Sequence, residues 1–239
     1  MKILITICGR GGSKGIAGKN IKEINNVPLI AYSINTAKKF AKNYDSTIAL
    51  STDSDLIKQV ASKYGLKTEY TRPEHLASDT AAKVDAIKDI LLFEENKNKV
   101  KYDYLLDLDI TSPLRNLDDL NSAFKMILED TDCLTLFSVN KPHRNPYFNM
   151  VEEQPNGYFS IVKKMDGVFL TRQSTPKVYD VNASFYFYRR EFFDLGLKTP
   201  LTDKTLVYIT PHICFDVDEE VDFTFLTYLI ENNKLDFSL

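Results

Sequence analysis

Short apolar runs alternate with segments of helical periodicity along the first two-thirds of this chain, and this alternation limits the possible folds. The expected strands are 2–8, 47–50, 104–108 and 133–139. The expected helices are 28–40, 54–64, 79–94 and 117–128. Asp53 or Ser54 is the expected cap of the second helix, and Ser78 or Asp79 that of the third. The pattern predicts an α/β fold of three layers, a mostly parallel sheet with helices on both faces.

The alternation breaks at residues 141–180, where Pro, Asn and aromatic side chains are frequent. Within this stretch the Pro155-Asn156-Gly157 turn predicts a β-hairpin. We therefore expect a β-rich arm inserted into an α/β domain made of residues 1–140 and 181–239. The chain is expected to return to the sheet at 184–188 and to end in a helix over 221–229.

The arm carries several aromatic side chains that would form an exposed apolar patch. They are Tyr147, Phe148, Tyr158 and Phe159. A second copy of the chain is the expected cover, which predicts a homodimer. Folding of the arm back over its own domain is the alternative.

Composition excludes several classes of protein. The 239 residues are 44% hydrophobic and carry 30 Lys and Arg against 33 Asp and Glu, a formal charge of −3. These values exclude a disordered or fibrous chain and give no reason to expect nucleic acid as a partner. No apolar run approaches the ~20 residues that cross a bilayer. Residues 1–8 are apolar but lack a following cleavage site, so they are expected to form a buried strand.

The cysteines Cys8, Cys133 and Cys214 lie far apart and form no CxxC pair. This spacing predicts neither a disulfide framework nor a zinc site. We expect small buried side chains in a reducing cytoplasm, without a nucleophilic role.

The glycine-rich segment 9–20 follows the first strand and contains Arg10, Lys14 and Lys19. Glycines let backbone N–H groups approach phosphate oxygens, and the three cations suit a triphosphate. A Walker A loop is excluded because Ser13 and Asn20 stand where it needs Gly and Ser or Thr. A GxGxxG fingerprint is excluded because it needs Gly in place of Lys14. The alternative is a solvated loop with incidental lysines.

This segment, GRGGSKGIAGKN, resembles the N-terminal signature of the acylneuraminate cytidylyltransferases. Four later segments resemble the family's motifs in the same order. They are RPEHLASDTA (72–81), DLDITSPLR (107–115), RQSTPKVYDVNASFYFYRR (172–190) and FDVDEEVDF (215–223). The resemblance implies a Rossmann-type nucleotidyltransferase fold and a homodimer. It also implies transfer of CMP from CTP to a nonulosonic acid with release of pyrophosphate, dependent on Mg²⁺ or Mn²⁺.

The resemblance also implies which residues contact CTP. The implied triphosphate contacts are Arg10, Gly11, Gly12, Ser13, Lys14, Lys19 and Asn20. Of these, Arg10, Lys14 and Lys19 are also expected to be catalytic. The implied cytosine pocket is Arg72, Ala77 and Ser78. Fixed polar groups can read a buried base edge, since leaving one unpaired costs about 1–3 kcal/mol. A surface turn at Arg72 and a helix cap at Ser78 are the alternatives.

Asp216 and Asp218 flank Val217, so an extended backbone would direct both carboxylates to one side. Mg²⁺ prefers one or two carboxylates together with phosphate oxygens and water. We therefore predict that both aspartates bind the metal, with helix capping as the alternative. Asp216 is also expected to be catalytic, either through the metal or by accepting the proton. Glu219, Glu220 and Asp222 are expected in the acidic first turn of the last helix.

The implied sugar contacts include one departure from the family. Sialic acid members usually have a glutamine where this chain has Asp109. An acceptor-only carboxylate should select a different donor pattern, so we expect a bacterial relative of sialic acid, with legionaminic acid ahead of pseudaminic acid. The alternative is that Asp107 and Asp109 bind another metal ion. The other implied sugar contacts are Thr111, Ser112, Arg172 and Gln173.

Other positions leave questions open. Ala183 stands where the family has glycine, and His143 and Arg144 lie near the position of a lysine that the family contributes from the neighbouring subunit. His75 and His212 have no nucleophile or base at a suggestive spacing and are expected to be structural. The alternative functions are a cytidylyltransferase for N-acetylneuraminic acid, Kdo or another sugar acid, use of another nucleotide, a non-catalytic nucleotide-binding regulator, and a structural protein built around the arm.

Overall fold

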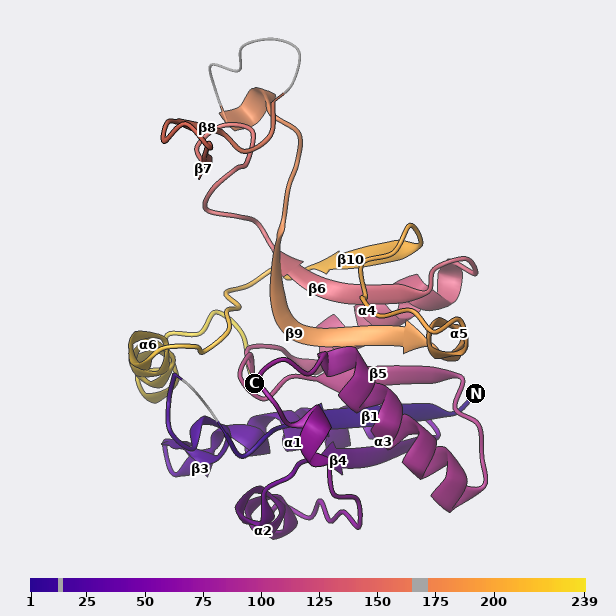
Figure 1. The fold of residues 1–239 in the computed structure, drawn as a ribbon. Helices are drawn as coiled ribbons and strands as arrows, with labels where there is room; N and C mark the ends of the chain where they lie inside the picture. The colour runs from indigo at the N-terminus through magenta and orange to yellow at the C-terminus, as the bar shows by residue number, and fades with distance from the viewer. Residues whose placement is uncertain (13–14, 165–171) are drawn as a thin grey trace.

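The computed structural model describes residues 1–12, 15–164 and 172–239, and its strands and helices alternate as predicted in the first 140 residues (Figure 1). The strands are β1 (Ile3–Cys8), β2 (Glu23–Ile24), β3 (Val27–Pro28), β4 (Ser46–Ser51), β5 (Tyr104–Leu108), β6 (Thr135–Asn140), β7 (Val151–Glu153), β8 (Phe159–Ile161), β9 (Asp180–Arg189) and β10 (Thr205–Ile209). The α-helices are α1 (Leu29–Ala41), α2 (Asp55–Lys63), α3 (Lys83–Asn98), α4 (Leu117–Glu129), α5 (Arg190–Asp194) and α6 (Glu220–Glu231). Short 3-10 helices are η1 (Lys19–Ile21), η2 (Glu74–Leu76) and η3 (Arg172–Ser174).

The central sheet has the strand order β10-β6-β9-β5-β1-β4. Strand β1 is parallel to β4 and β5, and β10 is parallel to β6, whereas β9 runs antiparallel to both β5 and β6. The prediction of a mostly parallel sheet is therefore confirmed. The first strands are buried on both faces, as parallel strands between helices must be.

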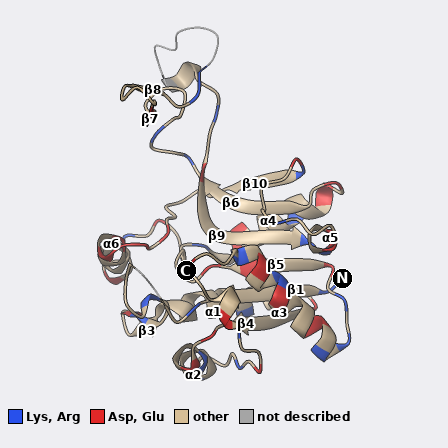
Figure 2. Cartoon of the chain, viewed as in Figure 1, with Lys and Arg blue, Asp and Glu red and all other residues tan. Residues whose placement is uncertain are grey.

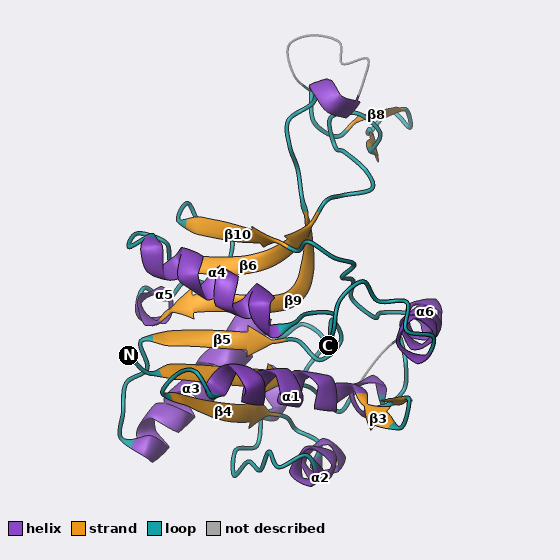
Figure 3. Ribbon diagram, turned by 180° about the vertical axis from the view of Figure 1, so that it is seen from behind, coloured by secondary structure: helices purple, strands orange, loops and turns teal. Residues whose placement is uncertain are grey.

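Two groups of buried side chains cover the two faces of the sheet. Ile3, Ile5 and Ile7 of β1 pack in a group with side chains of α1 and α4, whereas Leu4 packs in another group with α3 and α5. Figures 1 and 3, seen from opposite sides, show these two pairs of helices on opposite faces. The alternation of side chains along one strand thus builds the predicted three layers.

One predicted helix begins at the wrong residue. The sequence predicts a helix over 79–94 capped by Ser78 or Asp79, but α3 begins at Lys83, and Ala82 precedes it without a side-chain cap. The Asp79 carboxylate forms an ion pair with Arg10 and is not available as the cap. In contrast, Ser54 caps α2 as predicted, since its hydroxyl accepts a hydrogen bond from the Ile57 amide. Elements β2, β3, β10 and α5 were not anticipated.

The chain leaves the sheet after β6 and returns to it along β9, and residues 141–164 and 172–179 are described between these strands (Figure 1). Within this arm β7 and β8 form the expected antiparallel hairpin around Gly157, which has a φ of +79°. The arm exposes apolar side chains, including Phe148, Val151, Tyr158 and Phe159. Figure 2 shows both signs of charge interspersed over the α/β body.

Candidate active site

A cavity of about 370 Å³ opens where β1, β4 and β5 end. Ligands of α/β proteins commonly bind at this edge of the sheet, beyond the carboxyl ends of the strands. The predicted site residues that line the cavity are Arg10, Lys19, Asn20, Arg72, Ser78, Asp109, Thr111 and Asp218. Segments predicted to bind the triphosphate, the base, the sugar and the metal therefore meet in one space.

The backbone of the glycine loop lies against the acidic segment near the end of the chain. A Cβ atom added to Gly15 would lie 2.2 Å from the carbonyl oxygen of Asp218, which leaves no room for a side chain. Gly18 has a φ of +64°, a conformation that favours glycine. Asn20 donates a hydrogen bond to the carbonyl of Arg10 at 2.9 Å and so fixes the start of the loop.

The two described cations of the loop are paired with carboxylates. Arg10 forms an ion pair with Asp79. The Lys19 ammonium donates to the carbonyl of Val217 at 2.5 Å and lies 3.3 Å from the Asp218 carboxylate. Gly11 donates its amide to Asp53 at 2.8 Å. Cations and an N–H group that suit phosphate oxygens thus face carboxylates in this structure.

Arg72 is buried at the end of β4, as a base-reading group would need to be. Its Nε donates to the Ser51 hydroxyl at 2.9 Å and its Nη2 donates to the Ser51 carbonyl at 2.8 Å. The alternative of a surface turn does not fit this burial. Ser78 lines the cavity with its side chain exposed, while Ala77 lies beside it outside the lining.

Asp216 and Asp218 lie beside the cavity on the segment that leads into α6. The Val217 amide donates to the Thr111 carbonyl at 2.8 Å, which fixes this segment to the loop after β5. Asp218 lines the cavity, and the buried Oδ1 atom of Asp216 has no hydrogen-bond partner among the described residues. Burial, and then the charges of Asp109 and Asp218, raise the pKa of the Asp216 carboxyl.

A divalent cation would give the buried Oδ1 atom of Asp216 a partner and would offset the negative charges that raise the pKa of this carboxyl. Within residues 1–12, 15–164 and 172–239, no group of three or more His, Cys, Asp or Glu side chains could hold a metal. Mg²⁺ does not require such a group when phosphate oxygens and water supply the other ligands. The pair Asp216 and Asp218 therefore fits a metal that arrives with a nucleotide. Glu219 and Asp222 form a capping box at the start of α6, as expected of its acidic first turn.

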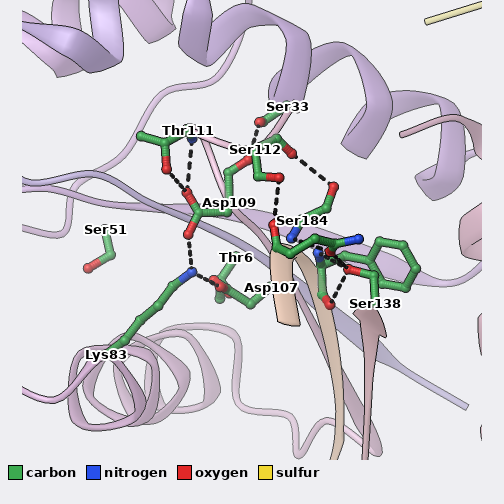
Figure 4. Close-up of polar contacts among 12 residues, drawn as sticks. Thr6, Ser33, Ser51, Lys83, Asp107, Asp109, Thr111, Ser112, Ser138 and Ser184 are labelled. Atoms are coloured by element: carbon green, nitrogen blue, oxygen red, sulfur yellow. Dashed lines mark hydrogen bonds and ion pairs between the residues drawn. The ribbon is translucent and has the colours of Figure 1, made fainter. Parts of the chain in front are cut away.

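Lys83, which the sequence analysis did not single out, faces the cavity from the first turn of α3. Its Nζ lies 2.8 Å from Asp107 Oδ2 and 2.5 Å from Asp109 Oδ2 (Figure 4). Asp107 is fully buried, and its Oδ1 accepts a hydrogen bond from the Thr6 hydroxyl at 2.7 Å. Because the Lys83 ammonium already lies between the two carboxylates, in the place where a shared metal ion would lie, the alternative that they bind a metal is disfavoured. A lysine in the first turn of a helix opposes the helix dipole, and this departure from the usual pattern was the sequence signal that could have identified Lys83.

The loop after β5 is fixed by buried polar groups. Thr111 donates both its amide and its hydroxyl to Asp109 Oδ1, each at 2.9 Å. Ser112 lies outside the cavity lining, fully buried, and donates to the Asn182 carbonyl at 2.7 Å. Arg115 is also buried and donates to the Asp109 carbonyl at 2.9 Å. Thr111 therefore lines the cavity, whereas Ser112 and Arg115 hold the loop.

Some predicted residues lie away from the cavity or outside the described structure. Gly11 and Gly12 do not line the cavity, and Gln173 lines a separate pocket in the arm with Lys141 and Lys177. Ser13 and Lys14 lie outside the described residues, and so does the side chain of Arg172. The sugar-facing role expected of Gln173 is therefore not met by the cavity of the same chain.

Ala183 adopts a φ of +58°, the left-handed conformation for which glycine is suited. The pairing of β9 with β6 shifts register at this point, so a bulge holds the residue in place. The neighbouring Asn182 fixes the bulge, since its Oδ1 accepts from the Ser138 hydroxyl at 2.5 Å. Alanine thus holds a left-handed backbone conformation that glycine adopts without strain.

The cysteines and His212 have structural surroundings. The three cysteines are free, and burial raises the pKa of each thiol, to about 12 for Cys8, where Asp107 adds to the effect. His212 Nε2 lies 2.9 Å from Asp119 and its ring stacks on Phe237. These features agree with the expectation that the cysteines are not nucleophiles and that His212 is structural. No helix of the described ranges is long and apolar enough to span a membrane.

Comparisons with known proteins show the family and the fold of this chain. A family described as Cytidylyltransferase matches residues 4–224. The post-translational flagellin modification protein B of Campylobacter coli is 42% identical over 236 residues, which cover 98% of this chain and 97% of the relative. The CMP-N,N'-diacetyllegionaminic acid synthase of Campylobacter jejuni is 41% identical over 236 residues, which cover 98% of this chain and 97% of that relative. A structure of a CMP:2-keto-3-deoxy-manno-octonic acid synthetase complexed with CTP superimposes with a TM-score of 0.69 at 16% identity, over 98% of this chain and all of that one.

Proposed function

The chain belongs to the cytidylyltransferase family, and from this premise we propose that it transfers CMP from CTP to a nonulosonic acid, with legionaminic acid favoured. Pyrophosphate is the second product. The activated sugar would serve the synthesis of bacterial surface glycans, which the flagellin-modifying relative supports. The free cysteines are consistent with a cytoplasmic location.

The observation that carries the proposal is the meeting of Lys19 with Asp218 at the cavity, 199 residues apart in the sequence. Arg10 and Lys19 can exchange their carboxylate partners for phosphate oxygens when CTP enters. Arg72 supplies fixed donors for the base. Attack of a sugar hydroxyl on the α-phosphate needs alignment and charge neutralisation more than it needs a covalent group. Arg10, Lys19 and Arg72 would supply these at the cavity.

The metal belongs to the proposal and would be held by Asp216 and Asp218. When bound, Mg²⁺ supplies charge neutralisation at the phosphates and lowers the pKa of a hydroxyl that it binds. Lys19 links the two halves of the site, because it contacts the loop of Val217 and Asp218 while belonging to the glycine segment. Asp216 is proposed as the carboxylate that accepts the proton of the sugar hydroxyl; in the alternative, Asp216 acts only by holding the metal and the proton passes to water.

The sugar acid is expected to lie beside Asp109 and Thr111. Asp109 already accepts bonds from Thr111 and Lys83 through both oxygens, and a carboxylate can accept about four. It can therefore receive a donor from the sugar but cannot donate to one. This chemistry and the legionaminic acid relative both favour that substrate over N-acetylneuraminic acid.

A homodimer is also part of the proposal. The arm exposes Tyr158 by 75% and Phe159 by 64%, which favours a covered surface. Gln173 lies in the arm, outside the cavity of its own chain, so a sugar-facing role would require the cavity of a second copy. The arm would then serve both dimerisation and substrate binding.

Complementation tests the dimer. We expect Lys19→Met and Gln173→Ala each to lose activity as homodimers. Random reassociation of the two should restore about a quarter of the wild-type rate, because half of the dimers are mixed and each mixed dimer has one intact site of two. A monomer in sedimentation, or no recovery on mixing, would contradict the arrangement.

Turnover tests the activity itself. The full chain is assayed for pyrophosphate release with each of the four nucleoside triphosphates, crossed with legionaminic, pseudaminic, N-acetylneuraminic and Kdo acids. We expect product with CTP and the highest kcat/KM with legionaminic acid. Product only with another triphosphate would overturn the base assignment, and preference for N-acetylneuraminic acid would overturn the sugar assignment. Binding of CTP without release of pyrophosphate would favour the non-catalytic regulator.

A further inference from the structure

We propose that Lys83 is a positioning residue that holds the Asp109 carboxylate against the sugar acid, so that the two side chains select the substrate as one unit. This inference rests on the proposed function and extends it to a residue on a different element. Lys83 lies in the first turn of α3, whereas Asp109 follows β5. Both side chains line the cavity.

The geometry leaves the ammonium of Lys83 occupied. Its Nζ contacts Asp109 at 2.5 Å and Asp107 at 2.8 Å, and it lies 5.4 Å from the centre of the Tyr186 ring. An ammonium has three protons to donate, and two carboxylates and an aromatic face surround this one. Lys83 is therefore not expected to act as a further phosphate cation. Its contacts hold protein groups in place.

The Asp109 carboxylate is in turn fixed on both oxygens. Oδ1 accepts two bonds from Thr111 and Oδ2 accepts the bond from Lys83. Burial disfavours the charged form, but Lys83 and the Thr111 donors outweigh it and lower the pKa of Asp109 to about 2. The side chain is then a carboxylate, an acceptor of fixed orientation, at neutral pH. A neutral amide at this position would offer donors as well.

The arrangement is costly for the fold, which supports a functional reason for it. Lys83 opposes the dipole of α3 at its first residue, and no side chain caps that helix. Asp107 is completely buried, and desolvating a charged group costs several kcal/mol before pairing offsets it. An apolar contact between α3 and β5 would avoid these costs. Departures from local rules of this kind tend to mark functional sites.

The test compares Lys83→Met, Asp109→Asn and the double variant in the pyrophosphate assay with CTP and legionaminic acid. We expect each single variant to raise the KM for the sugar acid by about 10- to 100-fold, because a charge-assisted hydrogen bond is lost. The KM for CTP should stay within about threefold. The double variant should be no worse than about threefold beyond the poorer single variant, since the two residues act as one unit.

Lys198→Met is the matched control. Lys198 forms a 2.7 Å ion pair with Asp85, also in the first turn of α3, but does not line the cavity. We expect its two KM values to match the wild type within about twofold. If Lys83→Met does not fold, Asp109→Asn decides the question, since it keeps the pairing of Lys83 with Asp107.

Several results would overturn the inference. An unchanged KM for the sugar acid in Asp109→Asn or in soluble Lys83→Met would do so. If Lys83→Met raised the KM for CTP as much as the KM for the sugar acid, Lys83 would have a structural role only. If the fold-changes in KM of the two single variants multiplied in the double variant, the two residues would act separately. Absence of turnover in the wild type with every sugar acid would overturn the proposed function and, with it, this inference. An active wild type whose variants keep the KM for the sugar acid would overturn this inference alone.

Discussion

The ammonium of Lys19 donates a 2.5 Å hydrogen bond to the carbonyl of Val217, so the loop after the first strand touches the segment before the last helix. The same ammonium lies 3.3 Å from Asp218. This contact places the expected triphosphate-binding loop beside the expected metal-binding carboxylates. It is the relationship on which the assignment of the active site depends.

Replacing Lys19 should therefore impair catalysis more than stability. In Lys19→Met, kcat/KM for CTP should fall by about 100-fold or more, because a fixed cation at the reacting phosphates is lost. Lys22→Met is the control, since Lys22 pairs with Glu220 of α6 at 2.7 Å but does not line the cavity. Steady-state kinetics should show less than about a twofold change in the control. Equal losses in both variants would contradict the assignment.

The close approach of Gly15 to Asp218 predicts a second outcome. Gly15→Ala places its Cβ against a backbone carbonyl, so the free energy of unfolding in urea should drop by about 1–3 kcal/mol. Gly12→Ala is matched in the same loop, where a Cβ would meet no described atom within 4 Å. Its stability should change by less than about 0.5 kcal/mol. A stable Gly15→Ala variant would show that the two segments do not touch.

The left-handed backbone at residue 183 predicts a stabilising substitution. Ala183→Gly should raise the free energy of unfolding by about 0.5–1 kcal/mol, because relief of the left-handed strain exceeds the entropy that glycine adds to the unfolded chain. Ala61→Gly in the interior of α2 should lose about 1 kcal/mol instead. Urea unfolding of both variants measures the difference. A loss in Ala183→Gly would mean that its φ is not positive in solution.

His212 predicts a dependence of stability on pH. Burial disfavours the charged ring, but the hydrogen bonds to Asp119 and to the Ile213 carbonyl raise the pKa of His212 above 6.5. The stabilisation is thus complete below the unfolded value and is lost as pH rises through the folded one. The stability lost in His212→Gln should be larger near pH 6 than near pH 9.

Urea unfolding at the two pH values measures the effect of His212. His75→Gln on the exposed turn of η2 is the control, and it should change stability by less than about 0.5 kcal/mol at both pH values. A larger loss in His212→Gln at the higher pH would reverse the expected sign. It would mean that the neutral ring is the one stabilised in the fold.

Local periodicity predicted the layers, because a buried strand or an amphipathic helix is visible within a few residues. It missed β10, which ends the sheet, and the start of α3. The second error has a clear cause: Asp79 looks like a helix cap in sequence, but Arg10, 69 residues earlier, binds its carboxylate. Pairings across that distance are not encoded in local spacing.

Site residues that belong to a sequence motif could be predicted, whereas those defined by tertiary contacts could not. Arg10, Lys19, Arg72 and Asp218 reach the cavity as their motifs implied. Ser112 comes from an equally specific motif, but its hydroxyl donates a hydrogen bond to the Asn182 carbonyl inside the protein. Lys83 belongs to no motif quoted for the family, and its importance emerges only once β5 brings two aspartates to it. Burial and pairing are tertiary properties.

A crystal structure of the full chain with CTP and Mg²⁺ tests the central claim most directly. We expect the triphosphate against Arg10 and Lys19, with the base toward Arg72 and the ion on Asp216 and Asp218. The contacts of Arg10 with Asp79 and of Lys19 with Asp218 should be replaced by phosphate oxygens. CTP bound elsewhere, with both of these ion pairs intact, would contradict the account.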